Sequence, residues 1–356
     1  YEQLYDNMFR WHRVETDFTA RTLTLQCVGN SLNINEIAFF DEAGELIEAR
    51  VVNPVGTQAA LLDEQDTVPE SPSYFNGMYF DELYHARTAY EHLHNLAPYE
   101  SSHPPLGKLI ISVGIAVFGM NPFGWRIMGA LVGVAMLPVL YLFGKRLFRK
   151  TTYAFLCTAL FAVDFMHFTQ TRIATIDVYA VFFILLMYYF MYEYITMNFY
   201  ADGWKRTLRP LALSGLFFGL GAASKWTCIY AGGGLAVLFF GSLIARYRER
   251  GRLLCGSERE RQLAMGYWRN VLFTLLWCCL FFLLIPFTIY FCAYLPYYIY
   301  EAGSTQGYGL REAFSTLWRY QEFMYDYHSG LTATHPYQSA WWQWPFTLRP
   351  MWYYLS

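Results

Sequence analysis

Long stretches with almost no charged residues constrain this chain more than any other feature. About 20 apolar residues are enough to cross the hydrocarbon core of a bilayer. Only 15% of the 356 residues are charged, against about 25% in soluble domains. The sequence therefore predicts a mainly α-helical, polytopic membrane protein. Six transmembrane helices are expected, at residues 127–144, 152–169, 178–192, 211–224, 226–245 and 271–300.

The balance of charge and the absence of nucleotide and zinc motifs exclude several function classes. The formal net charge is −2, so there is no excess of basic residues for contacts with a phosphate backbone, and we expect no nucleic-acid partner. The sequence shows no P-loop, nucleophile elbow or zinc-ligand spacing. Hydrolase and nucleotide-binding functions are therefore disfavoured.

Lysine and arginine are distributed very unevenly among the loops between the expected spans. Three alternate loops carry fourteen of them, and each of the two intervening loops carries one. Positively charged loops stay on the cytoplasmic side of a membrane. The pattern predicts a multi-pass protein of the plasma membrane in which residues 1–125 and 293–356 are extracytoplasmic, with 297–356 forming a loop that covers the site.

Residues 109–125 are uncharged over 17 positions, but Asn121-Pro122-Phe123-Gly124 interrupts the stretch. A segment this short is more typical of an interfacial or re-entrant helix than of a span. We place it in an outer catalytic loop formed by residues 73–125, which precedes the six helices of residues 126–296.

Residues 1–72 have the composition of a soluble, β-rich ectodomain. Residues 22–28 alternate like a strand, and residues 37–40 and 45–48 flank an Asp-Glu-Ala-Gly turn as in a hairpin. This predicts a small N-terminal β-sandwich, similar to the discoidin-like carbohydrate-binding modules, although a purely structural ectodomain explains the pattern equally well. Because the chain begins with Tyr1, we expect it to be a piece of a longer protein, truncated at both ends.

Charged residues are scarce on the expected outer face, and the densest group contains Asp81 and Glu82. Adjacent carboxylates in a partly apolar setting repel each other. One of them can therefore have a raised pKa, or can bind a cation or a hydroxyl group. The alternative is a structural one, in which Asp81 caps the N-terminus of a helix.

Three cations lie near the ends of the expected spans. Arg172 shares a short turn with Asp177 and suits a phosphate at the level of the head groups, unless it pairs with Asp177 or snorkels. Lys225 stands beside Trp226 and could be an interfacial anchor instead of a ligand. Lys108 follows His103 in the segment that leads into the membrane surface.

An acidic pair, these cations and a Trp-rich loop on one face fit an anionic, lipid-linked substrate. The cations would hold its phosphate, and a carboxylate would accept a proton from an attacking hydroxyl. The Trp cluster at 341–344 could stack on sugar rings, but an aromatic belt at the membrane interface is the commoner explanation.

Five motifs, taken together and in order, resemble the protein O-mannosyltransferase family. The resemblance covers about residues 74–356 and is strongest to its bacterial branch of phospholipid carrier-dependent glycosyltransferases, within the C-type glycosyltransferase superfamily. The motifs are Phe80-Asp81-Glu82, His103-Pro104-Pro105-Leu106-Gly107-Lys108, the Arg172 to Asp177 turn, Ser224-Lys225-Trp226 and Leu331-Thr-x-x-His335-Pro336-Tyr337.

The resemblance implies inverting transfer of mannose from a polyprenyl-phosphate carrier to Ser or Thr hydroxyls of exported proteins. Asp81 matches the position of the catalytic base, and Glu82 matches its partner. The remaining matches imply contacts with the substrate or its phosphate for Arg172, Lys108, Lys225, His103, Asp177 and His335. No cofactor follows from the resemblance, although Asp81, Glu82 and His103 could bind a divalent cation.

Two departures from the family pattern affect this interpretation. Relatives carry a membrane helix upstream of the Asp-Glu loop, where this chain has an ectodomain, and no β-trefoil MIR module follows the last span. Two further functions remain open: a glycosyltransferase acting on a lipid or cell-wall glycan, such as aminoarabinose transfer to lipid A, and a polyprenyl-lipid transporter or flippase. A transporter predicts paired broken helices in inverted repeats, and the sequence shows no such pairing.

Overall fold

The computed structural model describes residues 11–26, 34–71, 73–332, 338–346 and 348–349. The chain divides into two compact units, residues 1–83 with 352–356 and residues 84–351. Each unit is described by itself.

The first unit contains little regular structure in its described residues. These form two 3-10 helices, η1 (Gly56–Leu62) and η2 (Gln65–Thr67), and a single antiparallel bridge between Phe40 and Leu46. The expected turn is present, because the Asp41 carboxylate accepts the N–H groups of Ala43 and Glu45.

The expected N-terminal β-sandwich is not supported. No strand forms within the described residues 11–26 and 34–71, and the described half of the expected strand at 22–28 is irregular. Every residue of known burial in those two ranges is at least partly exposed. A sheet of this kind is stabilised by burying one of its faces, and alternation without a packing partner does not provide that burial.

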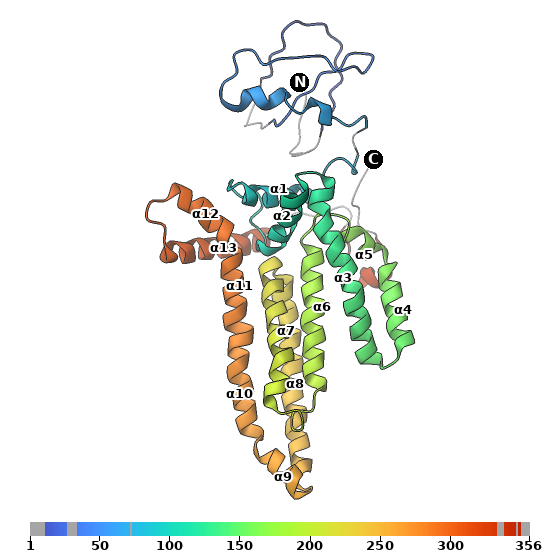
Figure 1. Cartoon of the computed structure of the whole chain (residues 1–356), viewed down its shortest axis with the longest axis vertical. Helices are drawn as coiled ribbons and strands as arrows, with labels where there is room; N and C mark the ends of the chain where they lie inside the picture. Colours follow the sequence, from blue (N-terminus) through green and yellow to red (C-terminus); the bar gives the residue numbers. More distant parts are fainter. Residues whose placement is uncertain (1–10, 27–33, 72, 333–337, 347, 350–356) are drawn as a thin grey trace. The chain divides into compact units, whose positions relative to one another are not determined.

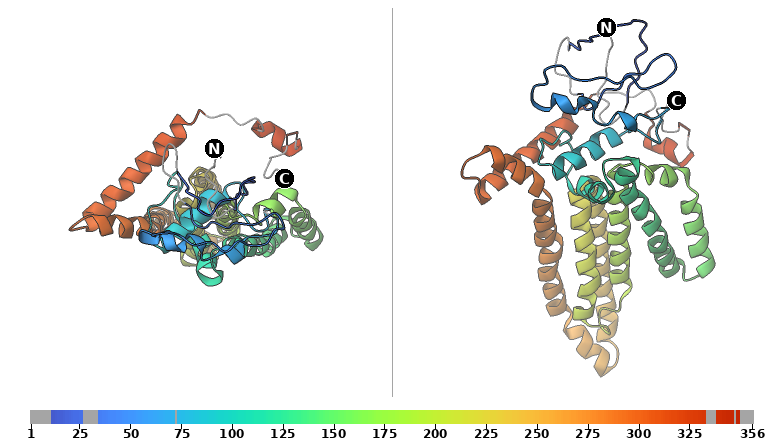
Figure 2. Two further views of the ribbon diagram at one scale, coloured as in Figure 1. Left: turned by 90° about the horizontal axis from the view of Figure 1, so that it is seen from above. Right: turned by 45° about the horizontal axis from the view of Figure 1, so that its top comes forward.

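The second unit is a bundle of helices (Figures 1 and 2). Its first helix, α1 (Glu82–Leu93), begins in the last two residues of the first unit. The other helices of the described residues are α2 (Leu106–Phe118), α3 (Pro122–Phe148), α4 (Thr151–Ala162), α5 (Phe165–Gln170), α6 (Asp177–Thr196), α7 (Trp204–Ser224), α8 (Thr227–Leu254), α9 (Glu258–Met265), α10 (Tyr267–Cys279), the π-helix η3 (Leu280–Leu284), α11 (Ile285–Ala293), α12 (Leu295–Ser304), α13 (Leu310–Gly330) and η4 (Trp341–Phe346).

Four helices of the described residues are long and apolar enough to cross a membrane. They are α3, α6, α8 and the continuous helix Glu258–Ala293 that joins α9, α10, η3 and α11. This supports a mainly helical, multi-pass membrane protein, and the expected number of six spans stays a prediction. The expected span at 152–169 is not one continuous helix, because α4 ends at Ala162 and the Asp164 carboxylate caps α5 by accepting the N–H of His167. In α7 the first turns carry Lys205, Arg206 and Arg209.

The structure defines where two expected segments end. The last long helix stops at Ala293 and α12 begins at Leu295, so the expected segment 271–300 is divided before its end. Helix α2 has 13 residues and stops at Gly119, whose φ of 85° is unfavourable for other residues. Its length of about 20 Å is too short for a hydrocarbon core of about 30 Å.

Helix α7 lies in the middle of the bundle and packs most closely where it carries glycine. A Cβ at Gly215 would lie 2.2 Å from the carbonyl oxygen of Phe281 in η3, and one at Gly219 would lie 2.8 Å from Cα of Pro286. Small residues let helix backbones approach in this way inside a membrane. Helix α2 lies at one end of the bundle, where α6 begins and α7 ends (Figure 1). We call this end the polar end.

Candidate functional site

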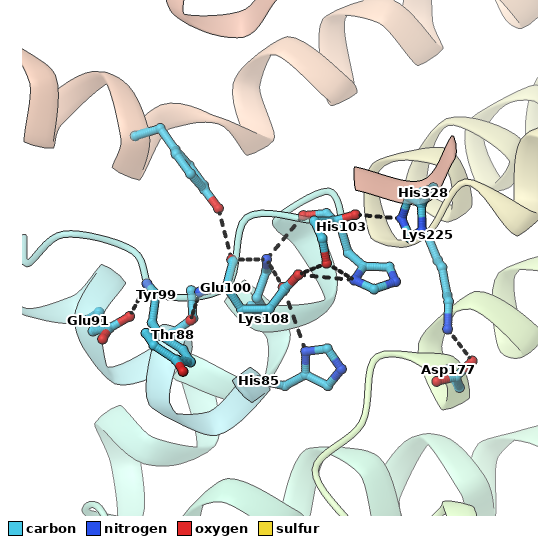
Figure 3. Close-up of polar contacts among 12 residues, drawn as sticks. His85, Thr88, Glu91, Tyr99, Glu100, His103, Lys108, Asp177, Lys225 and His328 are labelled. Carbon is cyan, nitrogen blue, oxygen red and sulfur yellow. Dashed lines mark hydrogen bonds and ion pairs between the residues drawn. The ribbon is translucent and has the colours of Figure 1, made fainter. Parts of the chain in front are cut away.

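A buried ion pair organises the polar end. Lys108, in the first turn of α2, is fully buried, and its ammonium donates to the Glu100 carboxylate at 2.6 Å (Figure 3). The same ammonium donates to the carbonyl oxygens of Glu100 at 2.8 Å and His103 at 3.1 Å. All three N–H donors of Lys108 are therefore satisfied within the chain.

The second carboxylate oxygen of Glu100 is also satisfied. The hydroxyl of Ser102 donates to it, and Nδ1 of His103 lies 3.1 Å away. Burial alone raises the pKa of Glu100, but the Lys108 ammonium and the His103 hydrogen bond together hold it well below its usual range. Burial alone lowers the pKa of Lys108, and the Glu100 carboxylate outweighs that effect, so the pKa is raised. Both groups are charged at neutral pH.

Two buried histidines of α1 surround this pair without being charged. Burial lowers the pKa of His85 and that of His92 to about 3. Although Nδ1 of His85 lies 3.9 Å from the Glu100 carboxylate, the ring is neutral and this contact is not an ion pair. Neither ring nitrogen of His92 has a hydrogen-bond partner among the described residues, and the centre of its ring lies 5.1 Å from that of Tyr297 in α12.

A second ion pair joins the helices of the bundle at the polar end. Lys225, directly after α7, donates to the carboxylate of Asp177 at the start of α6 at 2.6 Å. Both side chains are partly accessible to solvent. The described residues show no ion pair between Asp177 and Arg172, because the guanidinium of the exposed Arg172 lies over the ring of Phe168, 4.7 Å from its centre.

The end of α13 lies beside the loop that carries Ser102 and His103. Nε2 of His328 lies 2.9 Å from the carbonyl oxygen of Ser102, and the rings of His103 and His328 are 5.2 Å apart. The ring of Trp226, next to Lys225, lies 6.4 Å from that of His328. The predicted site residue His335 lies outside the described residues.

Asp81 and Glu82 occupy the start of α1. Asp81 is half-buried and directly precedes the helix; Glu82 is fully buried, and its carboxylate accepts the N–H of Tyr79 at 3.3 Å. The residue before them, Phe80, has a φ of 54°. A non-glycine residue in this left-handed region is strained by about 1–2 kcal/mol, and such strain is concentrated at functional sites.

The structure thus brings His103 and Lys108 into one cluster and pairs Lys225 with Asp177. Sequence analysis missed Glu100 and His85, which complete the first cluster. One signal for Glu100 was present, because Lys108 is the only charged residue of an otherwise apolar helix. A buried lysine requires a carboxylate partner. The described residues contain no group of three or more His, Cys, Asp or Glu side chains that could hold a metal ion.

Replacing Lys108 by Met should destabilise the protein, because Glu100 would stay buried without its cation. We expect the free energy of unfolding, measured by denaturant titration in mixed micelles, to fall by about 3–5 kcal/mol. The double variant Lys108→Met, Glu100→Gln should recover part of this loss, whereas the exposed Lys205→Met is the control with no loss. Equal losses in the single and double variants would contradict a stabilising role for the pair.

Stability should fall as the pH drops from about 6.5 towards 4. His92 stays neutral in the folded chain because its pKa is about 3, whereas in the unfolded chain it binds a proton near pH 6.5. Its contribution to stability is therefore complete above pH 6.5 and is lost on acidification. Below about pH 4.5, Glu100 acts in the same direction, because its pKa is lowered in the folded chain.

The variant His92→Leu isolates the histidine contribution. It should make the dependence of unfolding free energy on pH shallower by about 1.4 kcal/mol per pH unit between pH 6 and 4.5. The matched control is His94→Leu, at an exposed position two residues further on, which should leave the slope unchanged. The same slope in both variants would show that His92 is not buried in its neutral form.

Comparisons with known proteins agree on one family. The sequence model of the dolichyl-phosphate-mannose-protein mannosyltransferases matches residues 102–254. A polyprenol-phosphate-mannose–protein mannosyltransferase of Mycobacterium tuberculosis is 28% identical over 317 residues, covering 77% of this chain and 57% of the relative. The enzyme of that name from Mycolicibacterium smegmatis is 29% identical over 321 residues, covering 80% and 60%.

A solved structure shares the fold. It is the Pmt1–Pmt2 protein O-mannosyltransferase complex of S. cerevisiae bound to the sugar donor, with a TM-score of 0.52 and 17% identity, covering 64% of this chain and 31% of that chain. The chain spans about three fifths of the length of these mycobacterial relatives. The matched family model and the relatives support the protein O-mannosyltransferase family for this chain, and the solved structure shows that its fold is shared.

Proposed function

We propose that the full-length protein transfers mannose from polyprenyl-phosphate-mannose to Ser or Thr hydroxyls of exported proteins. The names of the mycobacterial relatives support this donor and a protein acceptor. The reaction would take place on the extracytoplasmic face of the plasma membrane, and the distribution of Lys and Arg among the loops supports this side for the polar end. Residues 1–72 would then be an extracytoplasmic appendage.

The observation that carries this proposal is that two helix N-termini and two solvent-accessible cations lie at the polar end of an apolar bundle. Helices α6 and α8 both begin there, and the N-terminus of a helix carries a partial positive charge that favours anions. Lys225 and Arg172 lie beside these N-termini in the chain and are not fully buried. A phosphate linked to a polyprenyl chain in the bilayer would meet these cations at the surface of the bundle.

Lys108 contributes differently under this proposal. Because its three donors bind Glu100 and His103, a direct contact with phosphate would require one of these bonds to break. We assign it the positioning of the loop that carries His103, while Arg172 and Lys225 neutralise the phosphate. His335 retains its predicted place around the substrate, and Asp177, which sequence analysis assigned to the same role, would be the partner of Lys225 without touching the donor.

The chemical step assigned to Asp81 is general base catalysis. The acceptor hydroxyl oxygen attacks the anomeric carbon of mannose, and its proton passes to the Asp81 carboxylate. The bond from the anomeric carbon to the phosphate oxygen breaks, and its electron pair leaves with polyprenyl phosphate. Attack from the side opposite the phosphate inverts the configuration. Glu82 would orient the base or the acceptor.

Asp81→Asn should lower the rate of mannose transfer to a Ser/Thr-rich peptide by about 10²–10⁴-fold. Asparagine keeps the shape of the side chain but cannot accept the proton. The assay uses membranes that contain the full-length protein and radiolabelled polyprenyl-phosphate-mannose. Asp66→Asn, at an exposed position of η2, is the control that should retain full activity.

The other outcomes of this assay separate the alternatives. An unchanged rate in Asp81→Asn would remove Asp81 from the mechanism. Donor consumption that depends on Asp81 without labelled peptide would keep the transferase and move the acceptor to a lipid or glycan. Lipid-linked label that crosses the membrane without being consumed would favour the transporter.

Lys225→Met should raise the KM for the lipid donor by about 10- to 100-fold, the equivalent of one hydrogen bond to a charged group. Lys225→Arg keeps the charge and should rescue most of the loss. Asp177→Asn removes the same ion pair but leaves the ammonium in place, so it should not raise the donor KM. Equal increases for Lys225→Met and Asp177→Asn would show that Lys225 acts only through the ion pair.

A further inference from the structure

Helix α13 lies at the level of the polar end and transverse to α11 (Figures 1 and 2). One of its faces is buried: Ala313, Leu317 and Met324 pack with three tyrosines at the end of α11 and in α12. A helix that only covers the bundle would expose polar residues on the rest of its surface. Instead, α13 has a second apolar face, which is exposed.

This exposed face is a stripe along most of the helix. At 100° per residue, its four members fall within an arc of about 80°. The same arc also holds Gln321, whose amide bonds to tyrosines at the end of α11, and His328 near the end of the helix. The exposed fractions of the four members are high, at 67% for Leu310, 45% for Phe314, 67% for Trp318 and 65% for Tyr325. We call these four residues the α13 stripe.

The α13 stripe is continuous with the surface of a membrane-spanning helix. The ring of Phe314 lies 4.9 Å from that of Phe291 and stacks on Phe287 at 6.3 Å, with 11° between the ring planes. Both phenylalanines belong to α11, in the last turns of the long apolar helix, and Phe287 is exposed. The exposed side chains of such a helix face lipid, so the stripe extends the lipid-facing surface around the corner from α11.

Charged residues flank the α13 stripe on its outer side. Arg311, Arg319, Glu322 and Asp326 lie in the neighbouring arc of about 80°. The indole N–H of Trp318 donates to the Glu322 carboxylate at 2.8 Å, and Arg319 pairs with Glu301 of α12 at 2.6 Å. A tryptophan whose ring is apolar and whose N–H is bound to a carboxylate is typical of the boundary between water and lipid.

We propose that α13 lies in the interface of the bilayer, with the α13 stripe inserted among the lipid acyl chains near the head groups. The occupant of this face is phospholipid of the bilayer itself. The geometry is that of an interfacial amphipathic helix, with an apolar arc towards lipid and a charged arc towards water. This inference rests on the contacts of α13 with α11 and is independent of the proposed function.

The consequence concerns the loop around Glu100. Helix α13 ends with His328 against the carbonyl oxygen of Ser102. A helix held in the interface therefore holds this loop at the depth of the lipid head groups. Under the proposed function, that is the depth at which a polyprenyl-linked phosphate lies.

Site-specific photo-crosslinking in the full-length protein tests the inference. A benzophenone amino acid is placed at Trp318 or Tyr325 of the α13 stripe, and at Ser315 or Asp326 on the charged side. All four positions are exposed, so none of these changes disturbs the core. The protein is reconstituted in vesicles of phosphatidylcholine and phosphatidylglycerol, irradiated, and analysed by mass spectrometry for lipid adducts.

We expect at least about tenfold more lipid adducts at positions 318 and 325 than at 315 and 326. Equal labelling at all four positions, or no lipid adduct at 318 and 325, would overturn the inference. Adducts of those two positions with polypeptide would assign the stripe to a protein partner and would overturn it as well. None of these outcomes depends on mannose transfer, so they leave the proposed function untouched.

A second measurement uses the conservative variant Trp318→Phe. In vesicles whose acyl chains are brominated near the head groups, the unaltered protein should lose more tryptophan fluorescence than the variant does. Equal losses of fluorescence would mean that Trp318 does not contact the acyl chains, and would contradict the inference without requiring an unnatural residue.

Discussion

The burial of Lys108 against Glu100 is the interaction on which the polar end depends. Removing an ammonium and a carboxylate from water costs several kcal/mol per ion, and only close geometry with every remaining bond satisfied offsets that cost. Here the contact of 2.6 Å and two carbonyl acceptors meet the condition for Lys108. Because Glu100 lies in the loop after α1 and Lys108 lies in α2, the pair fixes that loop on α2. Helix α2 in turn packs on α6, since a Cβ at Gly107 would lie 2.7 Å from Ile176. The loop is thereby held in a fixed position against the bundle.

The helical part of the fold could be predicted from hydropathy, because a helix in a membrane is stabilised mainly by its own composition and length. The short helix before Gly119 was predicted for this reason. The predictions failed where stability depends on packing that composition does not reveal. Alternation at 22–28 resembled a strand, yet no buried face exists in the described part of residues 11–71. Asp164 lay within an expected span, but its carboxylate caps α5 and breaks the helix.

The sequence indicated several residues of the polar end, but neither Glu100 nor the pairings between residues. Motif matching identified Lys108, Lys225 and Asp177 without indicating that Lys225 would pair with Asp177 across 48 positions of sequence. Lys108 was assigned to phosphate because a cation near a membrane surface suits an anion. The structure uses all of its donors on Glu100 and His103, so its charge is balanced within the protein. A buried cation that neutralises a carboxylate of the same chain, such as Lys108, is not available to a ligand, whereas a partly exposed cation such as Lys225 is. Burial and the distances to partner atoms distinguish the two kinds of cation, and the sequence contains neither.

Two independent contacts hold the loop that carries Glu100, Ser102 and His103. One is the buried ion pair, which attaches the loop to the bundle. The other is His328, which attaches the same loop to the end of α13 through the carbonyl of Ser102. The first contact sets the position of the loop relative to the helices. If α13 lies in the membrane interface, the second sets its position relative to the lipid surface. Under the proposed function, the donor is anchored in the bilayer and the acceptor arrives from water. The loop would then have to be fixed relative to both the helices and the lipid surface, because the anomeric carbon can react only at a depth that both substrates reach.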